Sequence, residues 1–111
     1  MSYRTFEIKQ GNLSPRIETV LEVDGTPLNL TLAAEVQLRM VLSRYPYTIA
    51  VSDNATGFAA DTTGAVWYQW LAGQTDVAGR YRIEWTVIYL DGKETTVPSK
   101  GFDHVEICKR A

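Results

Sequence analysis

The chain has 111 residues, the size of one ordinary domain, so we expect a single domain over residues 1–111 with one hydrophobic core. Hydrophobic residues make up 45% and charged residues 22%, as in globular proteins rather than disordered or membrane-spanning ones. The formal net charge is −2, whereas nucleic acids and anionic membranes select strongly basic surfaces. We therefore expect neither as a partner.

Cys108 is the only cysteine, which excludes an intrachain disulfide and leaves packing as the source of stability. The residues after Met1 lack the apolar stretch of a secretion signal, so we expect no leader peptide.

The N-terminal half alternates apolar and polar residues between Gly, Pro, Asn and Asp breakers, the pattern of short strands joined by turns. A first strand is predicted around residues 6–8 and a second over residues 17–23, followed by a turn at Asp24-Gly25. In the next strand the even positions from 36 to 42 point inward. The pattern continues the inward row through Tyr47, Ile49 and Val51.

Residues 52–64 are polar and weakly patterned, which predicts a variable loop with a possible short strand around Phe58. Beyond it the alternation is stronger. Asp91-Gly92 favours a type I′ hairpin turn, because both residues tolerate a positive φ, so Thr95 to Val97 should pair back antiparallel. The inward rows predicted in this half are Val66, Tyr68 and Trp70, then Tyr81, Ile83, Trp85, Val87 and Tyr89, and finally Val105 and Ile107.

These elements amount to about seven to eight strands at the spacing of a sandwich, so the predicted fold is an all-β, immunoglobulin-like antiparallel β-sandwich. Asp76, Ala78 and Gly79 precede Tyr81 roughly as in a tyrosine corner, where the hydroxyl bonds to upstream backbone and pins the connection between the sheets. An ordinary core tyrosine fits the same spacing, so both interpretations stay open.

No residue pattern indicates catalysis, and we expect no enzyme, no catalytic residues, no cofactor and no metal. His104 is the only histidine, and Cys108 follows four residues later, roughly 13 Å along an extended strand and out of hydrogen-bonding reach. Asp53, Asn54 and Asp61 would converge on a calcium ion only if their loop folded back on itself.

A partner surface is predicted instead at Trp67, Ile88 and Leu90, which fall on the outward side of their strands. If those strands are neighbours, the three side chains form an apolar patch of the kind that marks a partner surface. Alternatively, the loop over residues 52–64 folds across them. Trp70 and Trp85 fall in inward rows and are predicted core residues.

A series of turn motifs follows in a recognisable order along nearly the whole chain: Gln10 to Pro15, Asp24 to Thr31, Gly64 to Trp70, Ala72 to Thr75, Ala78 to Glu84, Asp91 to Lys93 and Thr96 to Pro98. In order and spacing they resemble the immunoglobulin-like domain at the N-terminus of the upper-baseplate proteins of tailed bacteriophages, which also occurs as short stand-alone phage structural proteins.

The resemblance implies a virion structural protein, made in the bacterial host cytoplasm, that attaches to a tail, baseplate or neck by β-domain docking. Its implied partners are other phage structural proteins, in several symmetric copies. The chain ends at Ala111 without the extension of the larger baseplate proteins, which leaves its position in the particle open. The alternatives are decoration of a capsid surface and a carbohydrate- or cell-surface-binding module that uses Tyr45, Tyr47 and the loop over residues 52–64.

Overall fold

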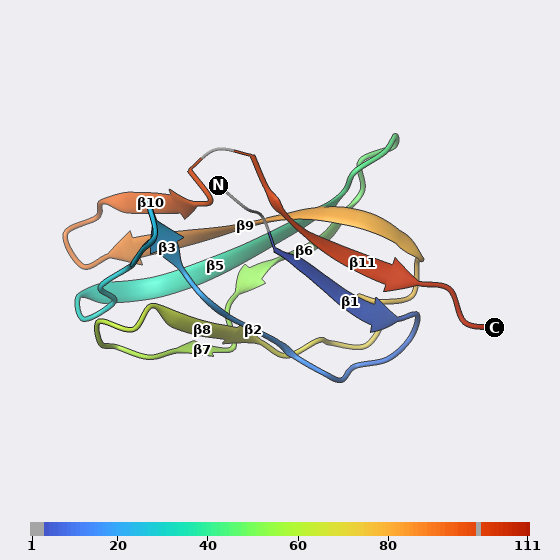
Figure 1. Ribbon diagram of the computed structural model, residues 1–111, viewed down its shortest axis with the longest axis horizontal. Coiled ribbons are helices and arrows are strands. Elements are labelled where there is room, and N and C mark those ends of the chain that lie inside the picture. Colours follow the sequence, from blue (N-terminus) through green and yellow to red (C-terminus); the bar gives the residue numbers. More distant parts are fainter. Residues whose placement is uncertain (1–3, 100) are drawn as a thin grey trace.

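The computed structural model describes residues 4–99 and 101–111, and it is an all-β sandwich of two facing sheets (Figure 1). None of these residues forms a helix that is long and apolar enough to cross a membrane. The strands are β1 Thr5–Lys9, β2 Ile17–Val20, β3 Glu22–Val23, β4 Thr26–Pro27, β5 Ala33–Leu42, β6 Ile49–Asn54, β7 Gly57–Phe58, β8 Ala65–Tyr68, β9 Gly79–Tyr89, β10 Glu94–Val97 and β11 Asp103–Cys108.

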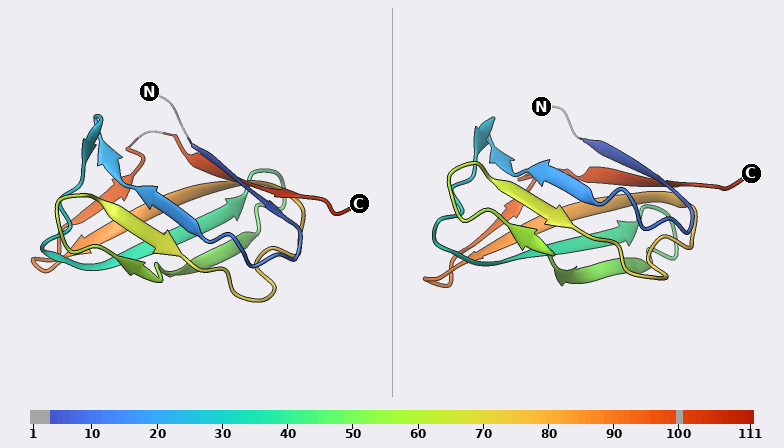
Figure 2. Two further views of the ribbon diagram at one scale, coloured as in Figure 1. Left: turned by 60° about the horizontal axis from the view of Figure 1, so that its bottom comes forward. Right: turned by 90° about the horizontal axis from the view of Figure 1, so that it is seen from below.

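The larger sheet has six strands, in the order β1-β11-β9-β5-β6, with β10 also paired to β9. Among the strands that the structure describes, β1 with β11 is the one parallel pair. The smaller sheet has the order β2-β8-β7 and lies across one face of the larger sheet, as the views from below show (Figure 2). A short hairpin, β3 with β4, turns at Asp24 and Gly25, both with positive φ (53° and 79°), which confirms the predicted turn.

The core lies between the two sheets and contains the inward rows that the sequence predicts. The row in β9 shows this best, because Ile83, Trp85 and Val87 are fully buried. The buried row of β5 and the row of residues 66, 68 and 70 complete the core from the two sheets. Tyr89, predicted in the same row, is half-buried at the edge of the core.

The structure corrects three details of the predicted strands and turns: the end of one strand, the length of one loop and the conformation of one turn residue. The second strand is not continuous to residue 23, because Leu21 breaks the ladder: its amide donates to Gly64 O (2.8 Å) and its carbonyl accepts from Leu28 N (2.8 Å). The predicted loop over residues 52–64 is shorter, since β6 runs to Asn54; the short strand around Phe58 is confirmed as β7. The β9–β10 hairpin is confirmed, but only Gly92 of the predicted turn pair has a positive φ (87°).

The inward row of Tyr47, Ile49 and Val51 is also corrected. Val51 is buried opposite Met40, but a bulge between Met40 and Val41 leaves Ala50 as an extra residue, so Ile49 is opposite Val41. One extra residue reverses the side to which the following side chains point. Ile49 is therefore 50% exposed and Tyr47 52% exposed, on the outer side of the larger sheet.

Tyr81 forms the bond of a tyrosine corner. Its side chain is buried, and its hydroxyl donates to the carbonyl of Val77 at 2.7 Å. Burial raises the pKa of Tyr81, so the hydroxyl keeps the proton that it donates. The bond holds the connection from the smaller sheet to β9 against the core.

Replacing Tyr81 with Phe should lower the free energy of unfolding by about 1 kcal/mol, because the partly buried hydrogen bond to the Val77 carbonyl is lost while the ring still packs. Urea denaturation monitored by tryptophan fluorescence measures the change. Tyr89→Phe is the control, since no hydrogen bond of the Tyr89 hydroxyl joins it to the described residues, and it should cost less than half as much. Equal costs for the two variants would show that the Tyr81 bond contributes nothing.

Candidate protein-binding face

The three predicted surface residues do not form one patch. Trp67 lies in β8 of the smaller sheet, whereas Ile88 lies in β9 of the larger sheet and Leu90 directly follows it, so Trp67 and the other two are on different sheets of the sandwich. The condition for a single patch, that their strands are neighbours, is therefore not met; the sequence pattern gives each strand's faces but not its sheet. Whether any of the three contacts a partner stays a prediction.

Trp67 is half-buried on the outer side of the smaller sheet, where it packs on a glycine. Gly57 is its register partner in β7, and a Cβ on Gly57 would lie 2.5 Å from the indole ring. The guanidinium of Arg16 covers the ring at 5.5 Å from its centre. The segment that carries β7 thus lies beside Trp67. This arrangement resembles the alternative in which residues 52–64 fold across it.

Leu90 is 72% exposed and pairs with another exposed leucine at one end of the sandwich. Its amide donates to the carbonyl of Leu32 (2.9 Å), and Leu32 is 64% exposed. Ile88 is half-buried opposite Glu94 and Glu35. Only Leu90 of the predicted trio is therefore a prominent exposed side chain.

The described residues contain no metal-binding cluster of acidic, histidine or cysteine side chains. No three His, Cys, Asp or Glu side chains gather there in a way that could hold a metal ion. Of the predicted calcium ligands, Asp61 caps its own turn through the amide and hydroxyl of Thr63 (2.9 and 2.6 Å), and Asp53 accepts from the Asn54 amide (2.8 Å). Each carboxylate thus serves local backbone.

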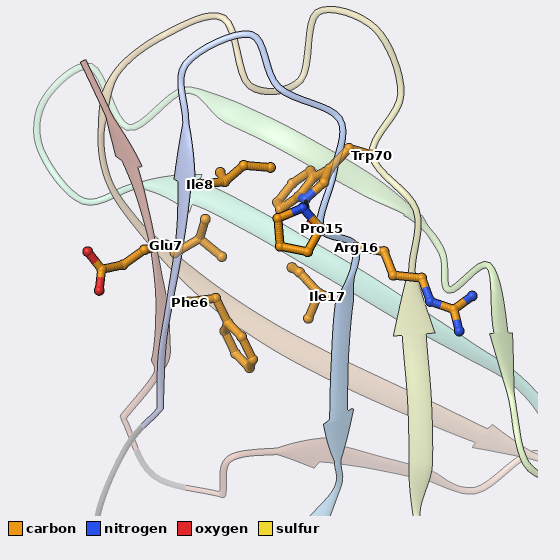
Figure 3. Close-up of a pocket in the computed structure, with 8 residues that line it drawn as sticks. Phe6, Glu7, Ile8, Pro15, Arg16, Ile17 and Trp70 are labelled. Atoms are coloured by element: carbon orange, nitrogen blue, oxygen red, sulfur yellow. Dashed lines mark hydrogen bonds between the residues drawn. The ribbon is translucent and has the colours of Figure 1, made fainter. Parts of the chain in front are cut away.

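A small apolar hollow of about 90 Å³ lies where the sandwich is open, between β1 and β2 (Figure 3). Core side chains line it, while Glu7 and Arg16 point away from it on either side, as the close-up shows. The buried Nε1 of Trp70 already donates to the carbonyl of Pro15 (3.1 Å). The indole N–H is therefore not available to orient a ligand in the hollow.

A second hollow, of about 260 Å³, lies on the outer face of the larger sheet, and its lining is charged and aromatic. Its centre is Arg82, whose guanidinium lies 4.8 Å from the ring centre of Phe102 and 5.8 Å from that of Tyr47. We call these three residues the Arg82 cluster. Arg82 and Phe102 line the hollow together with Arg39, Val41 and Glu84, and Tyr47 lies beside it.

The connection between β5 and β6 builds one wall of this face. It rises at one end of the sandwich, on the side away from the smaller sheet (Figure 1). Tyr45 is 84% exposed at its tip and meets Tyr47 edge to face, with ring centres 6.2 Å apart. Tyr47 has a φ of 56°, a conformation that costs a non-glycine residue about 1 kcal/mol or more. The hairpin thus holds an aromatic side chain over Arg82 at the expense of backbone strain.

The predicted carbohydrate site is not assembled. Tyr45 and Tyr47 precede the first residue of β6, and the loop predicted to join them begins after its last residue, Asn54. Strands rise by about 3.3 Å per residue, so the two parts lie at opposite ends of a strand.

The guanidinium of Arg82 carries hydrogen-bond donors that lack acceptors among the described residues. Its Nε atom is fully buried and has no hydrogen-bond partner in the described part of the chain. The ion pairs among described residues are Arg4–Glu22, Arg16–Glu18 and Arg80–Glu106, and none involves Arg39, Arg82 or Glu84. The buried Nε is out of reach of an outside group, but the Arg82 charge has no carboxylate partner among the described residues and can pair with an external one.

Sequence reasoning treats Arg82 as a solvated side chain and does not single out Phe102. The available signal was the position of Arg82 on the outward side of the longest strand, but its aromatic neighbours come from residues 20 to 35 positions away in sequence. No protein-family model, curated protein or solved structure matches the chain.

We expect Gly57→Ala to displace Trp67 and lower the free energy of unfolding by about 1–3 kcal/mol, since the new methyl group overlaps the indole ring. Denaturation of Gly57→Ala, Trp67→Ala and the double variant measures the coupling. The glycine substitution should cost much less once the indole is gone. An equal cost in both backgrounds would contradict the packing of Trp67 on Gly57.

His104 lies beside the Arg82 cluster, and its pKa is below its ordinary value. Partial burial is the first cause and the positive charge of Arg80 the second, with a further contribution from Arg82; Asp103 and Glu106 oppose the shift. Because the folded chain binds this proton less well than the unfolded chain, the stability contribution is complete above about pH 6.5 and is lost as pH falls through the folded pKa.

Arg80→Ala should therefore raise the pKa of His104, because it removes a neighbouring cation and leaves Glu106 unpaired. A proton–nitrogen NMR titration of the imidazole measures this. Arg39→Ala is the control, since Arg39 is not among the causes of the shift, and it should leave the pKa unchanged. A lower pKa in Arg80→Ala would contradict the electrostatic account.

Proposed function

We propose that this chain is a structural protein of a bacteriophage particle, a docking module of the tail, baseplate or neck. The order of turn motifs supports the phage assignment. The observation that carries the docking role is the Arg82 cluster, a charged and aromatic face with unpaired donors. Arginine and tyrosine are enriched among the residues that dominate binding energy at protein interfaces, and Arg82 makes no ion pair with another described residue.

The strand arrangement also supports an immunoglobulin-like type of sandwich. The smaller sheet, β2-β8-β7, faces a larger sheet in which β11, β9, β5 and β6 follow one another, and Tyr81 makes its bond at the start of β9. In variable-type immunoglobulin domains the equivalent larger sheet likewise gains strands beyond its central three. In several symmetric copies, such a module would present one sheet to its neighbours while the other closes the core.

The outer face of the larger sheet is the better docking face of the two. On the smaller sheet Trp67 is already covered by Arg16 and packed on Gly57. On the larger sheet, the exposed side chains of Tyr47 and Ile49 stand beside the hollow. Apolar surface next to unpaired charge is the composition of an interface rather than of a solvated sheet.

Mass spectrometry of particles purified from cells that produce the encoding phage should find the chain in the assembled fraction. Arg82→Glu should stay in the unassembled fraction, because it places a carboxylate between two aromatic rings and removes the docking donors. Glu18→Arg, a charge reversal on the smaller sheet, is the matched control and should assemble normally. Thermal denaturation of both purified variants verifies folding.

Absence of the wild-type chain from particles would contradict the virion assignment, and normal incorporation of a folded Arg82→Glu variant would contradict the docking face. Trp67→Asp in the same assay tests the original prediction for the smaller sheet. Unchanged incorporation of that variant would exclude Trp67 from the interface.

A further inference from the structure

The outer face of the larger sheet carries unpaired charges of both signs. Arg82 and Glu84 are two residues apart in β9, so their side chains share that face, and Arg39 is the register partner of Glu84 in β5. All three line the 260 Å³ hollow, yet none makes an ion pair with another described residue. A partner that brings both an acid and a base to this face would match Arg82 and Glu84.

Arg82 is held in a fixed orientation. Tyr47 and Phe102 lie against the guanidinium on the β5–β6 side and on the β11 side of the cluster, at 5.8 and 4.8 Å. A guanidinium donates in its plane and accepts nothing, and Nε is buried, so a carboxylate would pair with the two terminal nitrogens. The acceptor that fits is a planar carboxylate approaching the sheet from outside.

We propose that a second copy of this chain covers this face, in a two-fold dimer in which Arg82 of each copy pairs with Glu84 of the other. The proposal rests on the proposed function, in that it takes the same face as the docking face. A two-fold axis that crosses β9 at the level of Ile83 places residue 82 of one copy opposite residue 84 of its partner. Two-fold symmetry forms the pair twice with one geometry.

The same axis brings apolar surface together. The β5–β6 connection lies beside Arg80, since the Ser43 amide donates to the Arg80 carbonyl (2.9 Å). Residue 80 is as far before Ile83 as residue 86 is after it, so each connection approaches the other copy near Thr86. The exposed ring of Tyr47, which lies beside Arg82, is then covered by the other copy between Glu84 and Thr86. The ion pairs and the apolar contacts thus favour one arrangement.

Charge complementarity favours a second copy over a purely acidic partner. A uniformly acidic segment would pair with Arg39 and Arg82 but would be repelled by Glu84 in the same hollow. A second copy presents the matching opposite charge to each member of the Arg82–Glu84 pair.

Sedimentation equilibrium of the purified full chain tests the dimer. The wild type should dimerise, whereas Arg82→Glu and Glu84→Arg should each weaken association by about 100-fold or more, because each variant places like charges opposite one another. An equimolar mixture of the two variants should associate again, since one copy is then acidic at both positions and the other basic. Glu18→Arg should dimerise like the wild type.

A wild-type chain that stays monomeric at millimolar concentration overturns the proposal, and so does a mixture of folded variants that fails to associate. These results are separable from the particle assay. A monomeric wild type whose Arg82→Glu variant is lost from particles would show that the face docks on a different protein, which leaves the proposed function standing. Thermal denaturation of each variant establishes that loss of association is not loss of folding.

Discussion

The antiparallel pairing of β5 with β9 is the constraint on which the rest of the molecule depends. It is the longest pairing in the larger sheet, running from Ala33 opposite Tyr89 to Leu42 opposite Tyr81. Side chains alternate between the two sides of a strand, so burying Leu38 and Trp85 inward also determines which residues point outward. Arg82 and Glu84 share the outer face because their odd-numbered neighbours are needed in the core.

The outer face acquires its shape from two local departures from regular structure. The bulge between Met40 and Val41 turns Ile49 outward, and the positive φ of Tyr47 lets the connection place an aromatic ring over Arg82. Both departures cost free energy that the buried part of the β5–β9 pairing has to offset. Strain of this kind, next to unpaired donors, is consistent with a surface shaped for a partner.

The two sheets of the sandwich differ in their outer faces. The smaller sheet closes the core, and its outer tryptophan is already packed on Gly57. The larger sheet buries one face equally well and leaves the other with charges that have no partner among the described residues. A domain built in this way is stabilised by its core. Its outer face supplies specificity, because its polar groups bind a partner with matching charges and disfavour other partners.

The amino-acid sequence alone predicts the all-β class, the inward rows of β5, β8 and β9, both hairpins and the lack of an intrachain disulfide. It could do so because alternation and turn chemistry are local properties of the chain. Only the tertiary structure decided that Trp67 and Ile88 lie on different sheets, because strand pairing joins distant residues. The bulge that exposes Ile49 could not be predicted either, because one extra residue does not change the composition of a strand. The Arg82 cluster unites residues 47, 82 and 102 and exists only once β6, β9 and β11 are in one sheet.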